Sequence, residues 1–475
     1  MKASSGHFER IIALEAPGGP PARVAVTVPG IVSPDERFDA HVVLLDERGY
    51  PSVEADGAAV VRLSGDEAER GRAEFEKGRP AIANVSGLSV SDVGLQRFEG
   101  EYDGATFFSN PVLCEQNPRQ RLFWGDPHVH TIISNCHPET CRSLDFGYLC
   151  ARYVTGLDWV CIADHVSNGR TDPGKWKAQQ VASAVYDDPP HFTNLLAYEA
   201  SLKGGCGGDN NVYFKAPRAE YVDEYEDGNV ATLIEKLGEQ EFFVVPHHTT
   251  RTGKHGELRH ELYCGPEHHS NVEIYSKWGA SEYRGNPDPL NKIHPGPAYV
   301  QDFLARGMRF GLMGGTDTHA TMSGGYGEEP THIGRAPGIT GVWMNNLSRE
   351  ALYSGLQSRS CYATSGERIL VRVEVAGGRG GTTMKWEDPS KPRQLKITAA
   401  APGPIARVDV VRNAQVRTLT PDDWQAKWDF IEDDDLSEVA FDPTPSTPRP
   451  FVYYYVRVTC ESGARAWTGP VWLML

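Results

Sequence analysis

Asp126, His128 and His130 lie at alternate positions, directly after the apolar residues 122–124. Side chains at alternate positions of a β-strand project to the same face. Neutral imidazole nitrogens bind divalent ions at about 2 Å, so the two histidines could approach one ion together. A solvated strand edge would explain this motif alone equally well, and the case for a metal site depends on residues that follow later apolar runs.

Ligand-type residues also stand where four later apolar runs end. They are Asp164 and His165, Glu199, His247 and His248, and Asp317 and His319. If the runs are strands of a β/α barrel, their ends form one rim, where residues distant in sequence can meet around one ion.

Neighbouring residues on a strand point to opposite faces. We therefore expect one of His247 and His248 to bind metal and the other to pack or hydrogen bond behind it. By the same reasoning we expect His165 to be a ligand, with Asp164 orienting an imidazole.

About four histidines and two carboxylates exceed the ligands that one tetrahedral ion requires. The sequence therefore predicts two or three divalent ions, with Glu199 or Asp317 as the bridging carboxylate. Clustered cations activate water near neutral pH and stabilise the attacking and leaving oxygens of a hydrolysed ester. The predicted chemistry is metal-dependent hydrolysis without a serine or cysteine nucleophile.

Basic residues follow two of these runs and could bind an anionic substrate. They are Arg251 and Lys254 after His248, and Lys277 after residues 272–276. The alternative for each is a solvated loop position. The glycine-rich segment 203–209 lacks the GxxxxGK[ST] pattern of a phosphate-binding P-loop.

Strand-like and helix-like segments alternate between residues 119 and 365. Strands are predicted over residues 122–130, 157–165, 192–199, 242–247, 272–276, 310–316 and 341–344. Helices are predicted over residues 144–155, 175–185, 231–237, 298–306 and 349–358, the last with Ser348 as its N-cap. Seven such units favour a TIM-like parallel β/α barrel over the alternative, an open sheet.

The flanking segments, residues 1–118 and 366–475, contain short β-branched or alternating runs. These runs cover residues 23–28, 40–45, 58–63, 369–375, 406–412, 451–458 and 466–473. Such spacing without helical periodicity predicts an N-terminal and a C-terminal β-sandwich-like domain.

The chain of 475 residues has a net charge of -16, which argues against binding to nucleic acid or to an anionic membrane. No apolar run has the length of a membrane span, and the first residues lack the apolar core of a secretory signal, so we expect a cytoplasmic protein. The nine cysteines include no CxxC pair, and reduced thiols are expected.

As an ordered set, the histidine and acidic motifs resemble those of the PHP (polymerase and histidinol phosphatase) superfamily. The motifs are GDPHVHT (125–131), ADH (163–165), YE (198–199), PHH (246–248) and GTDTH (315–319). Three further segments look like its DUF3604 branch: VEIYS (272–276), LSREA (347–351) and CYATSGER (361–368). The resemblance covers roughly residues 119–370.

The resemblance implies a distorted seven-unit β/α barrel that holds two or three Zn, Mn or Fe ions and hydrolyses phosphoesters. The implied ligands are His128, His130, His165, Glu199, His247, Asp317 and His319. Glu199 would bridge two ions, and His247 is preferred over His248 because it follows its strand directly.

The sequence departs from the superfamily pattern at two places. A further ligand often follows the His-x-His motif, and here Cys136 or His137 could serve. A histidine often follows the fifth strand, where this chain has Trp278, and Glu273 or His269 is the candidate replacement.

The sequence thus predicts a phosphoesterase that uses metal-activated water to cleave a small anionic ester. His319 or His248 is the candidate proton donor to the leaving group. One alternative is hydrolysis of a carboxylic ester, carbamate or lactone by the same kind of site. An alternative of another class is a binding module that has lost catalysis.

Overall fold

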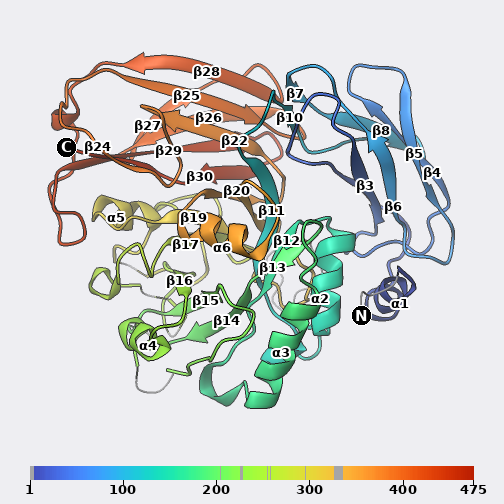
Figure 1. Cartoon of the computed structure of the whole chain (residues 1–475), viewed down its shortest axis with the longest axis horizontal. Helices are drawn as coiled ribbons and strands as arrows, with labels where there is room; N and C mark the ends of the chain where they lie inside the picture. Colours follow the sequence, from blue (N-terminus) through green and yellow to red (C-terminus); the bar gives the residue numbers. More distant parts are fainter. Residues whose placement is uncertain are drawn as a thin grey trace.

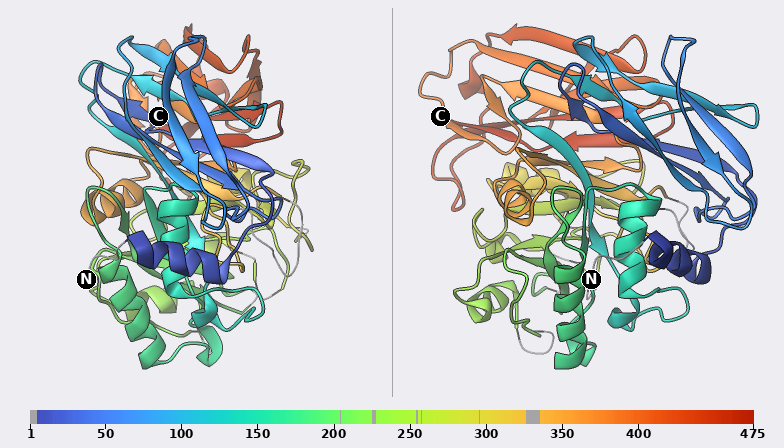
Figure 2. Two further views of the ribbon diagram at one scale, coloured as in Figure 1. Left: turned by 90° about the vertical axis from the view of Figure 1, so that its right-hand side faces the viewer. Right: turned by 45° about the vertical axis from the view of Figure 1, so that its right-hand side comes forward.

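β-Strands dominate the computed structural model, which describes residues 5–203, 205–224, 228–253, 255–256, 258–294, 296–325 and 335–475. The N-terminal strands and the C-terminal strands lie side by side, and the region that contains most helices lies below them (Figures 1 and 2). Among the described residues, no helix combines the length and the apolar character that a membrane crossing requires.

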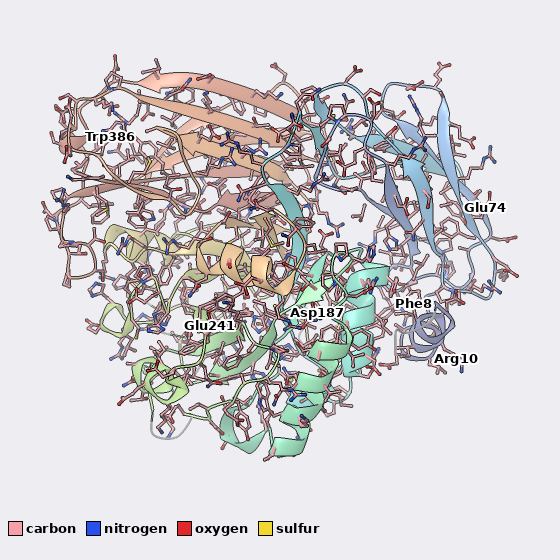
Figure 3. All side chains as sticks on the ribbon, in the orientation of Figure 1. Phe8, Arg10, Glu74, Asp187, Glu241 and Trp386 are labelled. Atoms are coloured by element: carbon pink, nitrogen blue, oxygen red, sulfur yellow. The ribbon has the colours of Figure 1, made fainter. Side chains whose placement is uncertain are left out.

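The N-terminal region consists of helix α1 (Ser5–Glu15) and three small sheets. The strands are β1 (Arg23–Thr27), β3 (Phe38–Leu45) and β6 (Ile82–Leu88); β5 (Glu69–Phe75), β4 (Gly57–Leu63), β8 (Phe98–Tyr102) and β9 (Ala105–Phe108); and β2 (Ile31–Val32), β10 (Val112–Cys114) and β7 (Gly94–Gln96). Alternate residues such as Val42, Ala59 and Val61 point inward and form a core of their own. Polar residues such as Glu74 on β5 lie on the outer surface (Figure 3).

One long sheet links the middle of the chain to its C-terminus. Its strand order is β13 (Thr193–Asn194), β12 (Trp159–Ile162), β11 (Arg121–Val129), β20 (Gly338–Met344), β21 (Cys361–Ser365), β30 (Arg465–Thr468), β29 (Phe451–Cys460), β26 (Ile405–Arg412) and β27 (Gln415–Leu419). Two further strands, β31 (Val471–Met474) and β24 (Thr383–Lys385), join it beside β29. Strand β11, which leads into the His-x-His motif, therefore belongs to the same sheet as the C-terminal strands.

Three smaller sheets complete the β structure of the described residues. They are β14 (Leu196–Ser201), β15 (Asp209–Phe214) and β16 (Phe242–Pro246); β18 (Gly279–Ala280), β17 (Asn271–Ser276) and β19 (Gly311–Gly314); and β23 (Gly378–Arg379), β22 (Leu370–Val375), β25 (Arg393–Ala400) and β28 (Gln425–Glu432). Apolar residues of β22 and β25 share one core with residues of β26 and β29.

The five predicted helices are confirmed, with shifted ends. They are α2 (Leu144–Leu149), which continues as a π-helical turn η2 (Cys150–Val154), α3 (Pro173–Val185), α4 (Val230–Leu237), α5 (Val300–Ala305) and α6 (Arg349–Gln357). The Ser348 side chain accepts a hydrogen bond from the Ala351 N–H and caps α6 as expected. The part of the chain that the structure describes also contains four short 3-10 turns: η1 (Ile132–Ser134), η3 (Ser167–Gly169), η4 (His260–Leu262) and η5 (Leu436–Glu438).

The predicted seven-unit TIM-like β/α barrel is wrong, because the sheets of the described residues form no closed barrel. Strands β14, β15 and β16 pair antiparallel, and β11 pairs antiparallel with β20. Antiparallel neighbours need only a short turn, whereas each parallel pair of a barrel needs a long crossover. Apolar runs predict strands but carry no information on strand direction.

The glycine-rich segment explains why β14 and β15 form a hairpin. Gly208 has φ +68°, and a Cβ added there would lie 2.5 Å from the Gly256 carbonyl oxygen. Only glycine fits such a turn without strain. The chain therefore returns directly along β14 as β15, a strand that the sequence did not predict.

A buried carboxylate joins the central region to the long sheet. Glu282 is fully buried and accepts hydrogen bonds from Tyr455 Oη at 2.6 Å, Arg457 Nη1 at 2.7 Å and Trp467 Nε1 at 2.6 Å. Arg457 also donates to Asp409 at 2.7 Å. The charges of this network are paired, as buried charges must be.

Candidate metal centre

The ends of five strands bring the predicted ligands together. His128 lies in β11, Glu199 lies in β14, and the other residues follow β11, β12, β16 and β19. Isolated β-bridges join His165 to Glu199, and Val129 to Thr318. Every one of the seven ligand candidates is buried: His128, His130, His165, Glu199, His247, Asp317 and His319.

A central group of four ligand atoms has tetrahedral dimensions. His128 Nε2 lies 3.2 Å from His130 Nε2, 3.3 Å from Glu199 Oε2 and 3.4 Å from Asp317 Oδ1. His130 Nε2 lies 3.1 Å from each of the two carboxylate oxygens. Ligands about 2.0–2.1 Å from a tetrahedral ion are separated by roughly 3.3 Å. The four side chains therefore fit one divalent ion such as zinc.

Hydrogen bonds on the far side of the imidazoles fix their orientation. His128 Nδ1 lies 3.0 Å from Glu273 Oε2, and His130 Nδ1 lies 3.1 Å from Ser134 Oγ. Such outer partners leave Nε2 free for a metal ion. The structure thus places Glu273 behind His128, and it adds Ser134, which the sequence did not predict.

Both carboxylates of the central group also face neighbouring histidines with their second oxygens. Glu199 Oε1 lies 3.3 Å from His165 Nδ1 and 3.6 Å from His247 Nε2. Asp317 Oδ2 lies 2.8 Å from His248 Nε2. His165 Nδ1 is buried, and its position beside Glu199 Oε1 suits a metal ligand. Each carboxylate could therefore share its oxygens between two ions.

Three further groups surround the central one, each with ligand atoms within 4.8 Å of one another. The groups are His130, Cys136, His165 and His319; His247, His248 and Asp317; and Glu199, Asp209 and His247. Contrary to the expectation that only one of the adjacent histidines faces the site, both His247 and His248 do. A turn explains this, because His248 has φ 51° and is no longer part of the strand.

Asp209 is a member of the site that the sequence did not predict. It begins β15, and its Oδ2 lies 2.8 Å from His255 Nδ1. The available signal was an acidic residue directly after a glycine-rich turn, a position where backbone approaches a ligand closely.

Two predicted acidic residues support the backbone of the site. Asp126 accepts hydrogen bonds from the Thr316 N–H at 3.0 Å and hydroxyl at 2.6 Å. Asp164 accepts from the Thr131 N–H and hydroxyl, both at 2.6 Å, and so holds the turn after His130 rather than an imidazole. Neither is a member of the four ligand groups.

Of the other predicted residues, His137 lies beside a ligand candidate and His269 lies in a separate core. The His137 ring centroid lies 4.8 Å from that of His319, and its Nδ1 lies 3.2 Å from Glu139 Oε1. His269 is no replacement ligand, because it stacks on Tyr263 in an apolar core where burial lowers its pKa to about 3. Trp278 donates from Nε1 to the Asp317 carbonyl oxygen at 3.1 Å.

Two ligand-bearing residues adopt left-handed backbone conformations. Asp317 has φ 50° and His248 has φ 51°. Non-glycine residues rarely adopt this conformation, and such strain concentrates at functional sites.

A cavity of about 260 Å³ opens onto the ligand groups. Its wall includes the guanidinium-bearing Arg170 and Arg251, together with His255 and Trp278. Arg251 was predicted to contact substrate and Arg170 was not. Lys277 is buried and does not line this cavity, and Lys254 lies outside the described residues.

The side chains of the centre form a cluster of ion pairs. Burial alone would lower the pKa of His130, but hydrogen bonds to Asp317 and Glu199 raise that pKa to about 10. Burial likewise opposes ionisation of Asp317, but His128 and His130 hold the pKa of its carboxyl well below the usual range. The raised pKa favours a proton on the His130 imidazole, which a metal ion would have to displace.

We expect metal binding to compete with the His130 proton. If one proton leaves His130 when the metal binds, the apparent affinity for metal rises about tenfold for each unit of pH. This rise ends near the His130 pKa of about 10. Without metal, the raised pKa stabilises the fold fully below pH 6.5, and this contribution disappears as pH rises through about 10. Chelator competition titrations from mildly acidic to alkaline pH measure the slope, and a pH-independent affinity would contradict the arrangement.

Comparisons with known proteins found uncharacterized relatives. An uncharacterized protein of Chlamydia pneumoniae is 24% identical over 98% of this chain and 76% of its own length. An uncharacterized protein of Chlamydia muridarum is 26% identical over 99% of this chain and 77% of its own length.

Among solved structures, an FMN-binding beta-glucuronidase from Facaelibacterium prausnitzii L2-6 aligns with 95% of this chain and 73% of its own, at 9% identity and a TM-score of 0.18. This likeness is too low to support an argument about fold. Residues 330–403 of the chain match the model of the family described as "Protein of unknown function (DUF3604)", which supports that part of the resemblance.

Proposed function

We propose that the chain is a metal-dependent hydrolase of a small phosphoester. The observation that carries the proposal is the tetrahedral group of His128, His130, Glu199 and Asp317, whose two carboxylates also face neighbouring histidines. Two or three divalent ions held there would supply Lewis-acid activation of water and charge stabilisation. The PHP resemblance supports the proposal through these ligand motifs alone, since the described residues form no closed barrel.

The residues of the cavity wall suit an anionic substrate. Arg170 and Arg251 offer guanidinium groups, which bind phosphate oxygens through paired charge-assisted hydrogen bonds. The volume of about 260 Å³ favours a small ester over a polymer. His248 and His319 both line the cavity, which keeps both as candidates to protonate the leaving group.

The test is reconstitution of the metal-free protein with Zn²⁺, Mn²⁺ or Fe²⁺ and assay against phosphomonoesters, phosphodiesters and carboxylic esters. We expect hydrolysis of a phosphoester that requires added metal. Turnover of carboxylic esters alone would replace the substrate class by the carboxylic ester, carbamate or lactone alternative. Stoichiometric metal binding without any hydrolysis would favour the binding module.

We expect Arg251→Ala and Arg170→Ala each to raise KM for the phosphoester by about tenfold or more. The reason is that a hydrogen bond to a charged group contributes about 1.5–3 kcal/mol. Metal content should not change, because neither side chain belongs to a ligand group. Arg10→Ala on the exposed face of α1 is the matched control (Figure 3). Equal KM values for all three variants would exclude a role of the cavity arginines in binding.

A further inference from the structure

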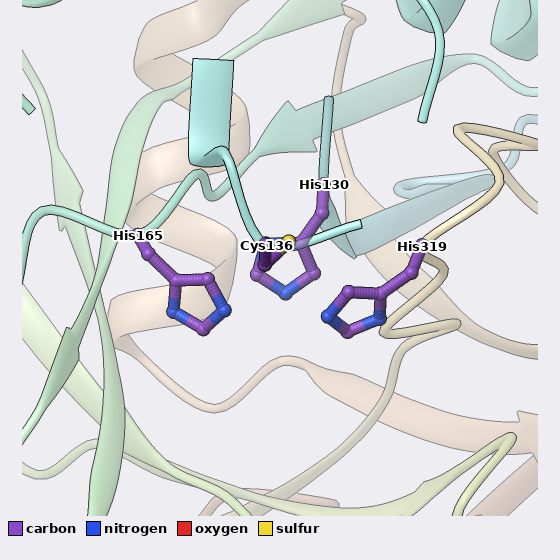
Figure 4. A group of neighbouring side chains, drawn as sticks. All are labelled: His130, Cys136, His165 and His319. Atoms are coloured by element: carbon purple, nitrogen blue, oxygen red, sulfur yellow. The ribbon is translucent and has the colours of Figure 1, made fainter. Parts of the chain in front are cut away.

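One ligand group of the centre contains sulfur. Cys136, His130, His165 and His319 come from the segments that follow β11, β12 and β19, and their side chains converge (Figure 4). Their ligand atoms all lie within 4.8 Å of one another, and Cys136 lines the cavity. A metal ion could therefore reach the thiol from solvent.

His130 belongs to the central group rather than to this one. Its Nε2 lies 3.1 Å from Glu199 Oε2 and from Asp317 Oδ1, and its Nδ1 is hydrogen bonded to Ser134. The ligands left for a second ion are Cys136, His165 and His319. Glu199 Oε1 lies 3.3 Å from His165 Nδ1 and is the candidate fourth ligand, which would give a set of one sulfur, two nitrogens and one oxygen.

The loop that carries Cys136 is fixed against the segment that carries His319. Thr140 Oγ1 donates to the His319 carbonyl oxygen at 2.7 Å, and Cys141 Sγ donates to the same oxygen at 3.2 Å. The loop itself is closed by the Cys141 N–H, which donates to the His137 carbonyl oxygen at 2.9 Å. The thiol is thus held in place by the fold.

We propose that Cys136, His165, His319 and Glu199 form a thiolate subsite that selects a thiophilic divalent ion, so that the loaded centre contains two kinds of metal. The inference rests on the metal centre of the proposed function. Thiolate ligands favour zinc or iron, whereas carboxylate and imidazole ligands also accept manganese. The other three groups offer only nitrogen and oxygen. A solution that contains both Zn²⁺ and Mn²⁺ would therefore fill the subsites unequally.

Cobalt substitution tests the subsite without any activity measurement. We expect metal-free protein loaded with Co²⁺ to show visible d–d bands together with a near-ultraviolet thiolate-to-cobalt charge-transfer band. Cys136→Ser should lose the charge-transfer band and keep d–d bands from the other subsites. Excess Mn²⁺ should weaken the d–d bands of the wild type and leave the charge-transfer band. Cys264→Ser is the matched control, because Cys264 is half-buried and belongs to no ligand group.

The contrary results distinguish a failure of the thiolate subsite from a failure of the whole metal centre. Visible bands without a charge-transfer band in the wild type would overturn the thiolate subsite and leave the metal centre of the proposed function intact. No cobalt binding at all would overturn both. If Cys136→Ser fails to fold, alkylation of the wild type decides: Zn²⁺ but not Mn²⁺ should protect Cys136 from iodoacetamide, and equal labelling under both conditions would overturn the proposal.

Discussion

Glu199→Gln is expected to remove bound metal and to lower phosphoester hydrolysis by about 10²–10³-fold, the usual loss when one preorganised charge-stabilising group is removed. The carboxylate lies between four histidines, with Oε2 facing His128 and His130, and Oε1 facing His165 and His247. An amide keeps the shape but places an NH₂ donor where a ligand oxygen is needed. Elemental analysis and steady-state rates measure the two effects.

Glu74→Gln is the matched control for this variant, because Glu74 is exposed on β5, far from the ligand groups in the chain (Figure 3). Circular dichroism should show the same fold for both variants. A Glu199→Gln protein with wild-type metal content and wild-type turnover would refute the bridging role of Glu199.

Glu282→Leu is expected to lower the free energy of unfolding by about 3–5 kcal/mol, because removal of one partner from a buried ion pair leaves the other without full compensation. Tyr455 and Trp467 would lose their acceptor inside the protein, and Arg457 would keep only Asp409. The midpoint of urea-induced unfolding, followed by tryptophan fluorescence, measures the loss.

The matched control is Glu374→Leu, which breaks the exposed Glu374–Arg379 pair at 3.1 Å. Exposed ion pairs contribute about 0–1 kcal/mol, so this change should be small. Equal losses in the Glu282 and Glu374 variants would contradict the importance of the buried network.

The ligand candidates could be predicted from the sequence for a physical reason. His128, Glu199 and Asp317 stand within or directly after apolar strand cores, and a polar residue at such a place is seldom explained by packing. The residues that hydrogen bond to the ligand histidines were harder to predict. The Glu273 carboxylate and the Ser134 hydroxyl become partners of the histidines only when distant segments meet.

The fold was less predictable than the site. Strand β15 begins with Asp209, Asn210 and Asn211, which read as a loop in the sequence but are fully or almost fully buried beside the centre. Without that strand, β14 and β16 looked like units joined by helical crossovers. The direction of a strand depends on the turn before it, and the left-handed conformation at Gly208 was not encoded in any apolar pattern.

The long sheet joins the C-terminal strands to the strands beside the candidate metal centre. Strand β21 pairs with β20 on one side and with β30 on the other, through Tyr362–Thr468, Ala363–Trp467 and Thr364–Ala466. A fragment that stopped after β21 would present a row of open N–H and C=O groups, which is a template for pairing between molecules. Strands far from the ligand groups thus cover an open edge of the sheet that contains His128, and their removal is expected to promote self-association.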